Sequence, residues 1–250
     1  MTAKDWVGLI PAAGEGLRLA LPYPKELYPV IRENRYKPVS QFVIDNLVQA
    51  GIGHIVFVIN ETKHQLIGFF GNGRRFHCDI SYVVQDRASR NGASTSPGLA
   101  GALDAAYHLT RGKTVFFGMA DTIMMPTDVF SRSYGAAGGE DDVILTLFET
   151  DRPEKFGMVR MDGDGRVEAI VDKPSSTELK DMWGCIIWRP RFTELLHQCV
   201  QDGISDFAAI LNKGIDAGLK VRGVKVADGT YLDLGTYDEI ADMDRRFREI

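Results

Sequence analysis

Short runs of β-branched and aromatic residues alternate with longer segments of helical periodicity through the first half of the chain. The expected strands are residues 7–11, 55–59, 80–85 and 114–118, and the helices between them are expected at residues 39–50, at 99–109 and in a segment ending with 66–70. Parallel strands need long crossover connections, which helices usually provide. The alternation therefore predicts an α/β domain with a mostly parallel, doubly wound sheet and a ligand cleft at the carboxyl ends of its strands.

The second half has a different pattern, because Asp-Gly-Asp-Gly at residues 162–165 separates two strand-like runs. Such a turn is typical of an antiparallel hairpin. Further strands are expected at residues 183–188 and 221–226, and helices at residues 192–200, 207–215 and 237–247. No repeat, low-complexity tract or linker divides the sequence, so we expect residues 1–250 to form one domain with a mixed sheet.

Composition and charge argue against several classes of function. The 250 residues are 44% hydrophobic, enough for a sizeable core, and 29 Lys+Arg against 34 Asp+Glu leave a formal net charge of -5. A nucleic-acid-coating protein would need a basic excess. The longest apolar runs have strand length, so we expect neither a membrane span nor a targeting segment. Three scattered cysteines, Cys78, Cys185 and Cys199, fit neither a disulfide framework nor a metal knuckle and predict a reducing, cytoplasmic setting.

A glycine-rich loop directly follows the first expected strand. Residues 11–18 are Pro-Ala-Ala-Gly-Glu-Gly-Leu-Arg, and Pro24-Lys25 comes shortly after them. Glycines let the backbone approach a triphosphate closely, while Arg18 and Lys25 can neutralise its charge from two sides. Two rival loops fail, because a dinucleotide fingerprint needs glycine where Leu19 stands and a Walker A loop needs Gly-Lys-Ser/Thr after four residues. The loop therefore indicates a phosphate site of another kind.

These residues resemble the superfamily of nucleotidyltransferases that join sugar 1-phosphates to nucleoside triphosphates, whose signature is a Gly-x-Gly-x-Arg loop followed by Pro-Lys. Five further segments occur in the order typical of that family: Lys37-Pro38, residues 96–100, Asp121, residues 171–174 and residues 231–236. Within it the chain resembles glucose-1-phosphate thymidylyltransferases and uridylyltransferases, while the short gap from Arg18 to Lys25 is more similar to that of acetylglucosamine-phosphate uridylyltransferases and methylerythritol-phosphate cytidylyltransferases. It implies a three-layer α/β/α, Rossmann-like fold with a mostly parallel mixed sheet, of the nucleotide-diphospho-sugar transferase type.

The resemblance also implies the reaction and the ligands. A nucleoside triphosphate, with dTTP or UTP favoured, would condense with a sugar 1-phosphate to give a nucleotide sugar and pyrophosphate in a magnesium-dependent reaction. The nucleotide would bind residues 1–125 and the sugar phosphate residues 126–250. No nucleic acid or membrane partner is expected, and homo-oligomer formation stays open.

Particular residues take roles by the same resemblance. Lys25 would contact the phosphates of both substrates and Arg18 the leaving pyrophosphate, as the catalytic residues, while Asp121 and Asp233 would hold Mg²⁺. The nucleotide-binding residues would be Ala12, Ala13, Gly14, Glu15, Gly16, Gln85 and Gly98. The sugar-phosphate-binding residues would be Gly157, Asp172, Lys173 and Gly184. Lys173 would contact phosphate and Asp172 a sugar hydroxyl. Gln85 and Gly98 would read the base, since a glutamine amide both donates and accepts hydrogen bonds and matches a pyrimidine edge.

Simpler structural roles remain open for several of these residues. Asp121 or Asp233 could cap a following helix, Lys25 could lie in an exposed turn, and either Gly157 or Gly184 could be a packing point. Gln85 could be a surface residue. The stretch from Asp86 to Thr95 is longer than expected in the thymidylyl and uridylyl members, which leaves the base assignment open, and it could form a mobile lid or an extra substrate loop.

Two other functions also stay open at this point. One is a glycosyltransferase on a related fold, whose Asp-x-Asp metal motif could be matched by Asp162-Gly163-Asp164, although a hairpin turn explains that triplet better. The other is a non-catalytic, sugar-nucleotide-binding regulatory protein that kept the pocket.

Overall fold

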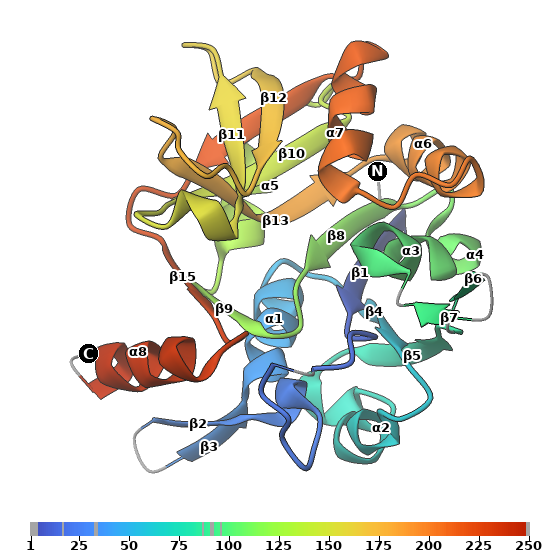
Figure 1. Ribbon diagram of the computed structural model, residues 1–250, viewed down its shortest axis with the longest axis vertical. Coiled ribbons are helices and arrows are strands. Elements are labelled where there is room, and N and C mark those ends of the chain that lie inside the picture. The colour runs from blue at the N-terminus through green and yellow to red at the C-terminus, as the bar shows by residue number, and fades with distance from the viewer. Residues whose placement is uncertain are drawn as a thin grey trace.

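The computed structural model describes residues 5–16, 18–32, 35–86, 88–90, 93–95 and 97–248, and its centre is a mixed sheet between two layers of helices (Figure 1). The parallel half has the order β8-β1-β4-β5. Its strands are β1 (Trp6–Pro11), β4 (His54–Ile59), β5 (Asp79–Val84) and β8 (Thr114–Gly118). Leu9 of β1 lies opposite Val56 on one side and Phe117 on the other, so β1 is central and buried on both faces.

The other half of the sheet joins through β13 (Asp181–Trp188), which pairs antiparallel with β8 so that Cys185 lies opposite Gly118. The remaining strands of this half are β10 (Val143–Glu149), β11 (Gly157–Met161), β12 (Val167–Asp172) and β14 (Val221–Lys225). β11 and β12 form the expected hairpin, and the Asp162 Oδ1 accepts hydrogen bonds from the backbone N–H groups of Asp164 and Arg166, at 2.9 Å each. Turn formation therefore accounts for Asp162-Gly163-Asp164, which leaves the Asp-x-Asp motif without structural support.

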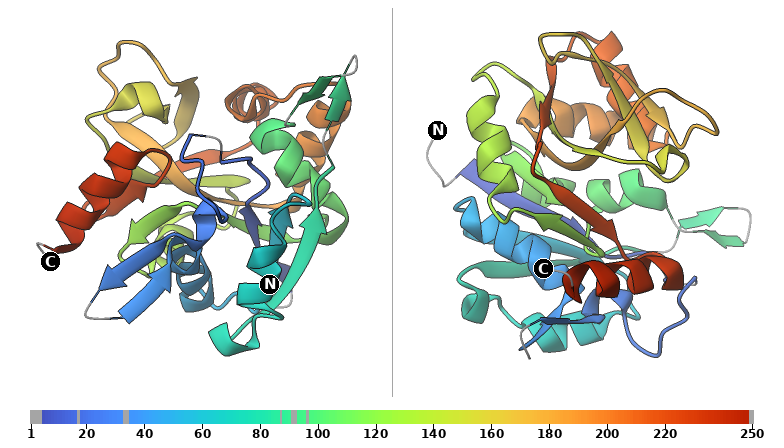
Figure 2. Two further views of the ribbon diagram at one scale, coloured as in Figure 1. Left: turned by 60° about the horizontal axis from the view of Figure 1, so that its bottom comes forward. Right: turned by 90° about the vertical axis from the view of Figure 1, so that its left-hand side faces the viewer.

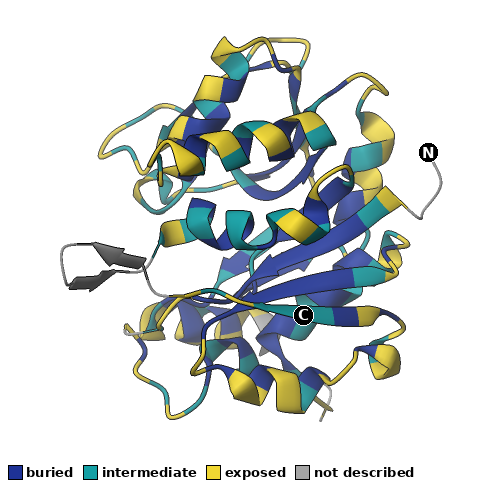
Figure 3. Cartoon of the chain, turned by 90° about the vertical axis from the view of Figure 1, so that its right-hand side faces the viewer, coloured by how far each residue is buried: buried dark blue, intermediate teal, exposed yellow. Residues whose placement is uncertain are grey.

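Helices cover both faces of the sheet. One face carries α1 (Val39–Gln49), α2 (His64–Phe70) and α5 (Val129–Ala136), and the other carries α3 (Gly98–Ala105), α4 (Tyr107–Thr110), α6 (Pro190–Gln201) and α7 (Phe207–Asp216). Successive side chains of a strand point to opposite faces of the sheet. Leu9 therefore packs in the core beneath α3, α6 and α7, and Ile10 packs in the core beneath α1, α2 and α5. Figure 3 shows the buried residues concentrated in the central strands and on the inner sides of the helices. The expected three-layer fold is confirmed.

Smaller elements surround the sheet. They are the ribbons β2 (Pro29–Arg32) with β3 (Arg35–Pro38), β6 (Ala88–Arg90) with β7 (Ala93–Thr95), and β9 (Thr122–Met125) with β15 (Thr230–Asp233), the helix α8 (Tyr237–Arg248), and the short 3-10 turns η2 (Lys25–Leu27), η3 (Arg74–Phe76) and η4 (Pro153–Lys155). Figure 2 shows β15 running from the second half of the chain to β9, with α8 continuing from it along the β2–β3 side. By pairing with β9, β15 brings a segment near the end of the chain next to the first half of the sequence.

The structure bears on three further expectations, which concern residues 86–95, the cysteines and membrane-spanning helices. The proposed lid at residues 86–95 contains the β6–β7 ribbon, but Arg87, Asn91 and Gly92 lie outside the described residues. All three cysteines are unpaired and buried. Within the part of the chain that the structure describes, none of the helices combines the length and apolarity that a membrane crossing requires.

Candidate active site

The glycine-rich loop leaves the carboxyl end of β1 with a buried base and an open tip. Ala12 donates its N–H to the Val58 carbonyl at 2.7 Å, and the Ala13 carbonyl accepts a hydrogen bond from the Asn60 side-chain amide at 2.8 Å. Gly14 and Glu15 are exposed, and Gly16 has a φ of +67°, a conformation that strongly favours glycine. The N–H of Ala12 is thus used by the sheet, while the residues at the tip face a cavity of about 330 Å³.

Both cationic residues border that cavity. Arg18 and Lys25 line it together with Gly14, Glu15 and Gly16. Arg18 also lies near Asp233, because a Cβ atom placed on Gly235 would lie 3.1 Å from the Arg18 Nη2 and 3.4 Å from the Asp233 Oδ2. The loop, the two cations and Asp233 therefore meet at one place in the fold.

Lys25 is largely buried in η2 and forms an ion pair with the Asp121 carboxylate. Burial alone would lower the pKa of Lys25, but the negative charges of Asp121, Glu26 and Asp233 outweigh it and raise that pKa above its ordinary value. An exposed turn lysine would have neither the burial nor the partner. Lys25 is held as a cation facing the acidic side of the site.

Asp121 and Asp233 come together through the β15–β9 ladder, although they are far apart in sequence. Asp233 lies opposite Thr122, the residue after Asp121, and the Leu234 N–H donates to the Asp121 carbonyl at 3.0 Å. Asp121 precedes a strand, so there is no helix for it to cap. At the start of α8 the cap belongs to Thr236, whose Oγ1 accepts from the Glu239 N–H at 3.3 Å. Helix capping therefore does not explain the position of Asp121, and α8 already has its cap.

The electrostatics around the two carboxylates fit a bound cation. Burial, together with the negative charges of Asp121 and Glu239, raises the pKa of Asp233 to about 7 in spite of Lys25 and Arg18. The described residues contain no cluster of three or more His, Cys, Asp or Glu side chains that could hold a metal. Mg²⁺ commonly takes one or two protein carboxylates and completes its shell with water and substrate phosphate oxygens. Asp121 and Asp233 match that donor set.

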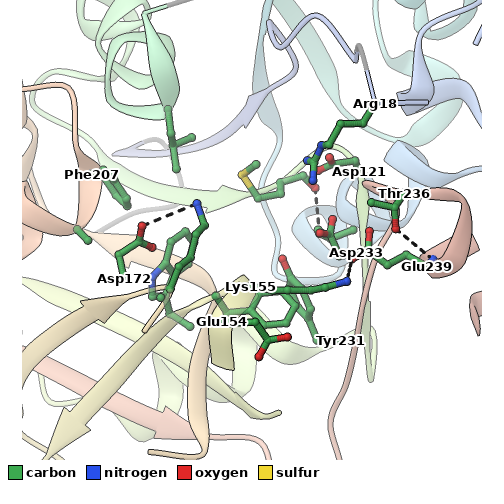
Figure 4. A pocket seen from close by; sticks show the side chains of 18 of the residues that line it. Arg18, Asp121, Glu154, Lys155, Asp172, Phe207, Tyr231, Asp233, Thr236 and Glu239 are labelled. Carbon is green, nitrogen blue, oxygen red and sulfur yellow. Dashed lines mark hydrogen bonds and ion pairs between the residues drawn. The ribbon is translucent and has the colours of Figure 1, made fainter. Parts of the chain in front are cut away.

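A larger cavity of about 690 Å³ opens on the other side of Arg18 (Figure 4). It is lined by Asp121 and Asp233 at one end, and further along by Asp172, the last residue of β12, and by Lys173 directly after it. The Lys173 Nζ lies 3.8 Å from the Asp172 Oδ2, and the Lys173 N–H donates to the Phe156 carbonyl at 2.9 Å. Both side chains are substantially exposed, at 62% for Lys173 and 41% for Asp172, and are accessible to a ligand.

The two glycines expected near the sugar have different surroundings. Gly157 lines the 690 Å³ cavity, and a Cβ there would lie only 2.2 Å from the Trp183 indole Nε1. Gly184 is not among the residues lining this cavity, and its Cβ would lie 2.6 Å from the Phe148 ring and 2.8 Å from the Tyr231 ring. Close packing explains Gly184, whereas Gly157 both makes room for an indole and borders the cavity.

Gln85 and Gly98 lie beyond the two cavities, near the start of α3. The Gln85 N–H donates to the Ile59 carbonyl at 2.7 Å, and its Nε2 is buried without a hydrogen-bond partner among the described residues. Gly98 has a φ of +72°, and its neighbour Leu99 lines the 690 Å³ cavity. Because the Gln85 amide is buried, Gln85 is more than a surface residue.

Residues 7–249 match a family model described as nucleotidyl transferase. The chain belongs to this family. The glucose-1-phosphate thymidylyltransferase of Streptomyces antibioticus is 25% identical over 262 residues, covering 96% of this chain and 66% of that protein. The low-salt glycan biosynthesis nucleotidyltransferase of Haloferax volcanii is 22% identical, covering 95% and 65%. The chain thus spans about two thirds of the length of these curated relatives.

A solved structure extends the likeness to the fold. A Bacillus anthracis crystal structure described as a glucose-1-phosphate thymidylyltransferase superposes with a TM-score of 0.82 at 21% identity, covering 98% of this chain and 96% of that one. The sugar-1-phosphate nucleotidyltransferase resemblance and the nucleotide-diphospho-sugar transferase fold are confirmed.

Sequence reasoning missed the aromatic wall of this nucleotidyl transferase. The larger cavity is lined by Phe156, Trp183, Phe207 and Tyr231. Three of them stand within two residues of a predicted site residue, since Phe156 precedes Gly157, Trp183 precedes Gly184 and Tyr231 comes before Asp233. Their position next to predicted site residues is the sequence signal that could have identified these aromatic residues.

A further ion pair was also missed. The Lys155 Nζ lies 2.7 Å from the Glu239 Oε1, while the Glu239 Oε2 accepts the Gly235 N–H at 2.9 Å. Burial alone would raise the pKa of Glu239, but the hydrogen bonds and charge of its partners lower it. Glu239 thus ties η4 to the segment that carries Asp233. No sequence signal links two residues so far apart.

Proposed function

We propose that the chain is a magnesium-dependent sugar-1-phosphate nucleotidyltransferase that condenses dTTP or UTP with a sugar 1-phosphate and releases pyrophosphate. The observation that carries this proposal is the meeting of the glycine loop, Arg18 and Lys25 with Asp121 and Asp233 at adjoining cavities. The first half of the chain, residues 1–125, would bind the nucleotide and residues 126–250 the sugar phosphate. Asp121 and Asp233 would hold the Mg²⁺, which when bound neutralises phosphate charge and polarises a phosphoryl oxygen.

The reaction needs positioning more than it needs a base. The second pKa of a phosphate monoester is about 6, so the attacking oxygen of the sugar phosphate is largely ionised at neutral pH. That oxygen forms a bond to the α-phosphorus. At the same time the bond between the α-phosphorus and the oxygen that joins it to the β-phosphorus breaks, and pyrophosphate leaves with the electron pair of that bond. The loop tip and Arg18 would hold the β- and γ-phosphates, and Lys25 would lie between the two reacting phosphates.

The sugar would occupy the larger cavity. In this proposal Lys173 would contact the phosphate, and Asp172 would accept a hydrogen bond from a sugar hydroxyl. The indole of Trp183 lines the same cavity and would pack against the C–H groups of the pyranose ring.

Trp183→Ala tests this subsite. Loss of the aromatic surface is expected to raise the KM for glucose 1-phosphate about tenfold, equivalent to about 1.4 kcal/mol, and to leave the KM for the triphosphate unchanged. Trp6→Ala is the matched control, because Trp6 packs on Phe116 and Tyr134 away from the cavity and its loss should leave both KM values unchanged. An unchanged KM for the sugar phosphate in Trp183→Ala would remove Trp183 from the subsite.

The preference for a pyrimidine rests on the Gln85 amide, whose buried Nε2 lacks a partner in the described part of the chain and can hydrogen-bond to a base edge. The decisive experiment is a screen of dTTP, UTP, CTP, ATP and GTP against glucose 1-phosphate and other sugar 1-phosphates, with pyrophosphate release as the readout. We expect release with dTTP or UTP that requires Mg²⁺. A folded protein that binds a nucleotide sugar but releases no pyrophosphate with any pair would be a regulatory binding protein instead.

A further inference from the structure

A buried ion pair lies directly beside the turn that carries Lys25. Glu26, the next residue in η2, places its Oε1 at 2.6 Å from the Lys63 Nζ. The side chains are only 2% and 6% exposed, respectively. Lys63 comes just after β4 and lines, together with Glu15, Gly16 and Lys25, a cavity of about 270 Å³. The pair therefore connects the β4–α2 loop to the lysine turn.

The same β4–α2 loop also holds the glycine-rich loop. The Asn60 amide donates to the Ala13 carbonyl, while the Asn60 Oδ1 accepts from the N–H of Thr62 at 3.0 Å and from its hydroxyl at 2.7 Å. The Lys63 N–H donates to the Asn60 carbonyl at 3.1 Å. Residues 60–63 are thus a single hydrogen-bonded unit that contacts the glycine-rich loop through Asn60 and the Lys25 turn through Lys63.

Apart from the Lys25–Asp121 ion pair, the other attachments of the Lys25 turn are hydrogen bonds of its backbone, including one that the Leu27 carbonyl accepts from the Tyr36 hydroxyl at 3.3 Å. Within η2, the Leu27 N–H donates to the Pro24 carbonyl and the Tyr28 N–H to the Lys25 carbonyl, both at 2.9 Å. The Ser40 hydroxyl of α1 donates to the Glu26 carbonyl at 2.7 Å. One turn of 3-10 helix does not set its own orientation against a sheet. Its orientation therefore depends on side-chain contacts such as the one from Glu26 to Lys63.

Stability is a poor explanation for this pair. Burial raises the pKa of Glu26 in spite of the Lys63 charge, and the Glu26 Oε2 has no hydrogen-bond partner within the described ranges. Desolvating two charges often costs as much as their attraction returns, so a well-packed apolar pair would stabilise the fold at least as well. What the ion pair adds is a directional constraint between two loops that both border the phosphate region.

We propose that Glu26 and Lys63 are positioning residues that fix η2 so that the Lys25 ammonium stays at the site shared by Asp121 and the glycine-rich loop. The inference rests on the proposed nucleotidyl transfer, in which Lys25 contacts the reacting phosphates. Displacement of a catalytic group by about 1 Å can cost about 10²-fold in rate, so the orientation of this short turn matters for turnover.

Three variants test the proposal after the wild-type protein has been shown to release pyrophosphate. Glu26→Gln is expected to lower kcat about 10- to 100-fold with little change in the KM for the triphosphate. The double variant Glu26→Met, Lys63→Met replaces the pair by apolar groups and is expected to keep or raise Tm while kcat stays low. Asp141→Asn, which removes a buried partner of Arg222 elsewhere in the fold, is the control that lowers Tm and leaves kcat unchanged.

The outcomes separate this inference from the proposed function. A wild-type protein without pyrophosphate release refutes the function; wild-type activity together with a double variant of normal kcat refutes the positioning role. A readout independent of turnover is the rate at which Lys25 is modified by acetic anhydride, followed by mass spectrometry. The double variant should label Lys25 several-fold faster than the wild type, with exposed Lys225 as the internal reference. Equal labelling rates at Lys25 would also overturn the proposal.

Discussion

Lys25→Met is expected to lower kcat for pyrophosphate release by about 10²- to 10³-fold, the usual cost of removing one preorganised charge-stabilising donor. Methionine keeps much of the side-chain length and loses the ammonium that pairs with Asp121. Because negative charge gathers on the phosphates as the bonds change, the loss falls mainly on kcat. Steady-state kinetics over both substrates would measure it.

The same variant has a second consequence, visible without turnover. In the wild type the Lys25 ammonium is the cation next to Asp121, so a divalent ion has to compete with it for that carboxylate. Lys25→Met is therefore expected to bind Mn²⁺ more tightly than the wild type, as measured by titration calorimetry.

Lys225→Met is the matched control, because Lys225 is exposed and pairs only at the surface with Asp181. A Lys25→Met enzyme with kcat within threefold of wild type would show that the ion pair with Asp121 has no part in the reaction.

The parallel half of the sheet is predictable from sequence because its signals are local. Strands such as β1 and β4 are short apolar runs bounded by glycine or polar residues, and α1 carries its own apolar periodicity. The turn residues at 162–165 predict the β11–β12 hairpin. These elements can therefore be predicted without knowing which segments they pack against.

Other elements depend on partners far away in sequence. β9 and β15 are four residues each, too short to show a pattern of their own. Among the described residues they form a two-stranded sheet with each other, across more than a hundred residues of sequence. β10 is an apolar run interrupted by Thr146, and periodicity alone does not distinguish such a run from a buried helix. Sequence analysis missed all three.

The candidate site divides in the same way. Residue types in ordered motifs suffice to select Arg18, Lys25, Asp121 and Asp233, but no motif shows that Lys25 and Asp121 form an ion pair. That contact depends on the tertiary fold, which brings η2 next to the connection between β8 and β9 that carries Asp121. The aromatic wall escaped prediction because a buried aromatic side chain is more often part of a core than of a binding site.

Asp121→Asn and Asp233→Asn are each expected to abolish Mg²⁺-dependent pyrophosphate release, because the amide that replaces the carboxylate carries no charge to hold the ion. The two variants should differ in the stability of the metal-free protein. Asp233 is a half-buried carboxylate whose pKa is raised to about 7 by desolvation and by neighbouring acids, so its ionised form destabilises the fold above pH 7 and Asp233→Asn should raise Tm at pH 8. Asp121→Asn leaves the largely buried Lys25 ammonium without its partner and should lower Tm.

Differential scanning calorimetry in a chelator would measure these opposite shifts, and pyrophosphate release at rising Mg²⁺ concentration would measure the loss of activity. Asp228→Asn is the control for charge alone, since Asp228 is an exposed acid paired with Arg132 at the surface and should keep both activity and Tm near wild type. The two measurements are independent, because a metal-free Tm contains no contribution from catalysis. Near-normal Mg²⁺-dependent turnover in both variants would reject the metal assignment, whereas equal Tm shifts would show that Lys25 is not the counter-ion of Asp121.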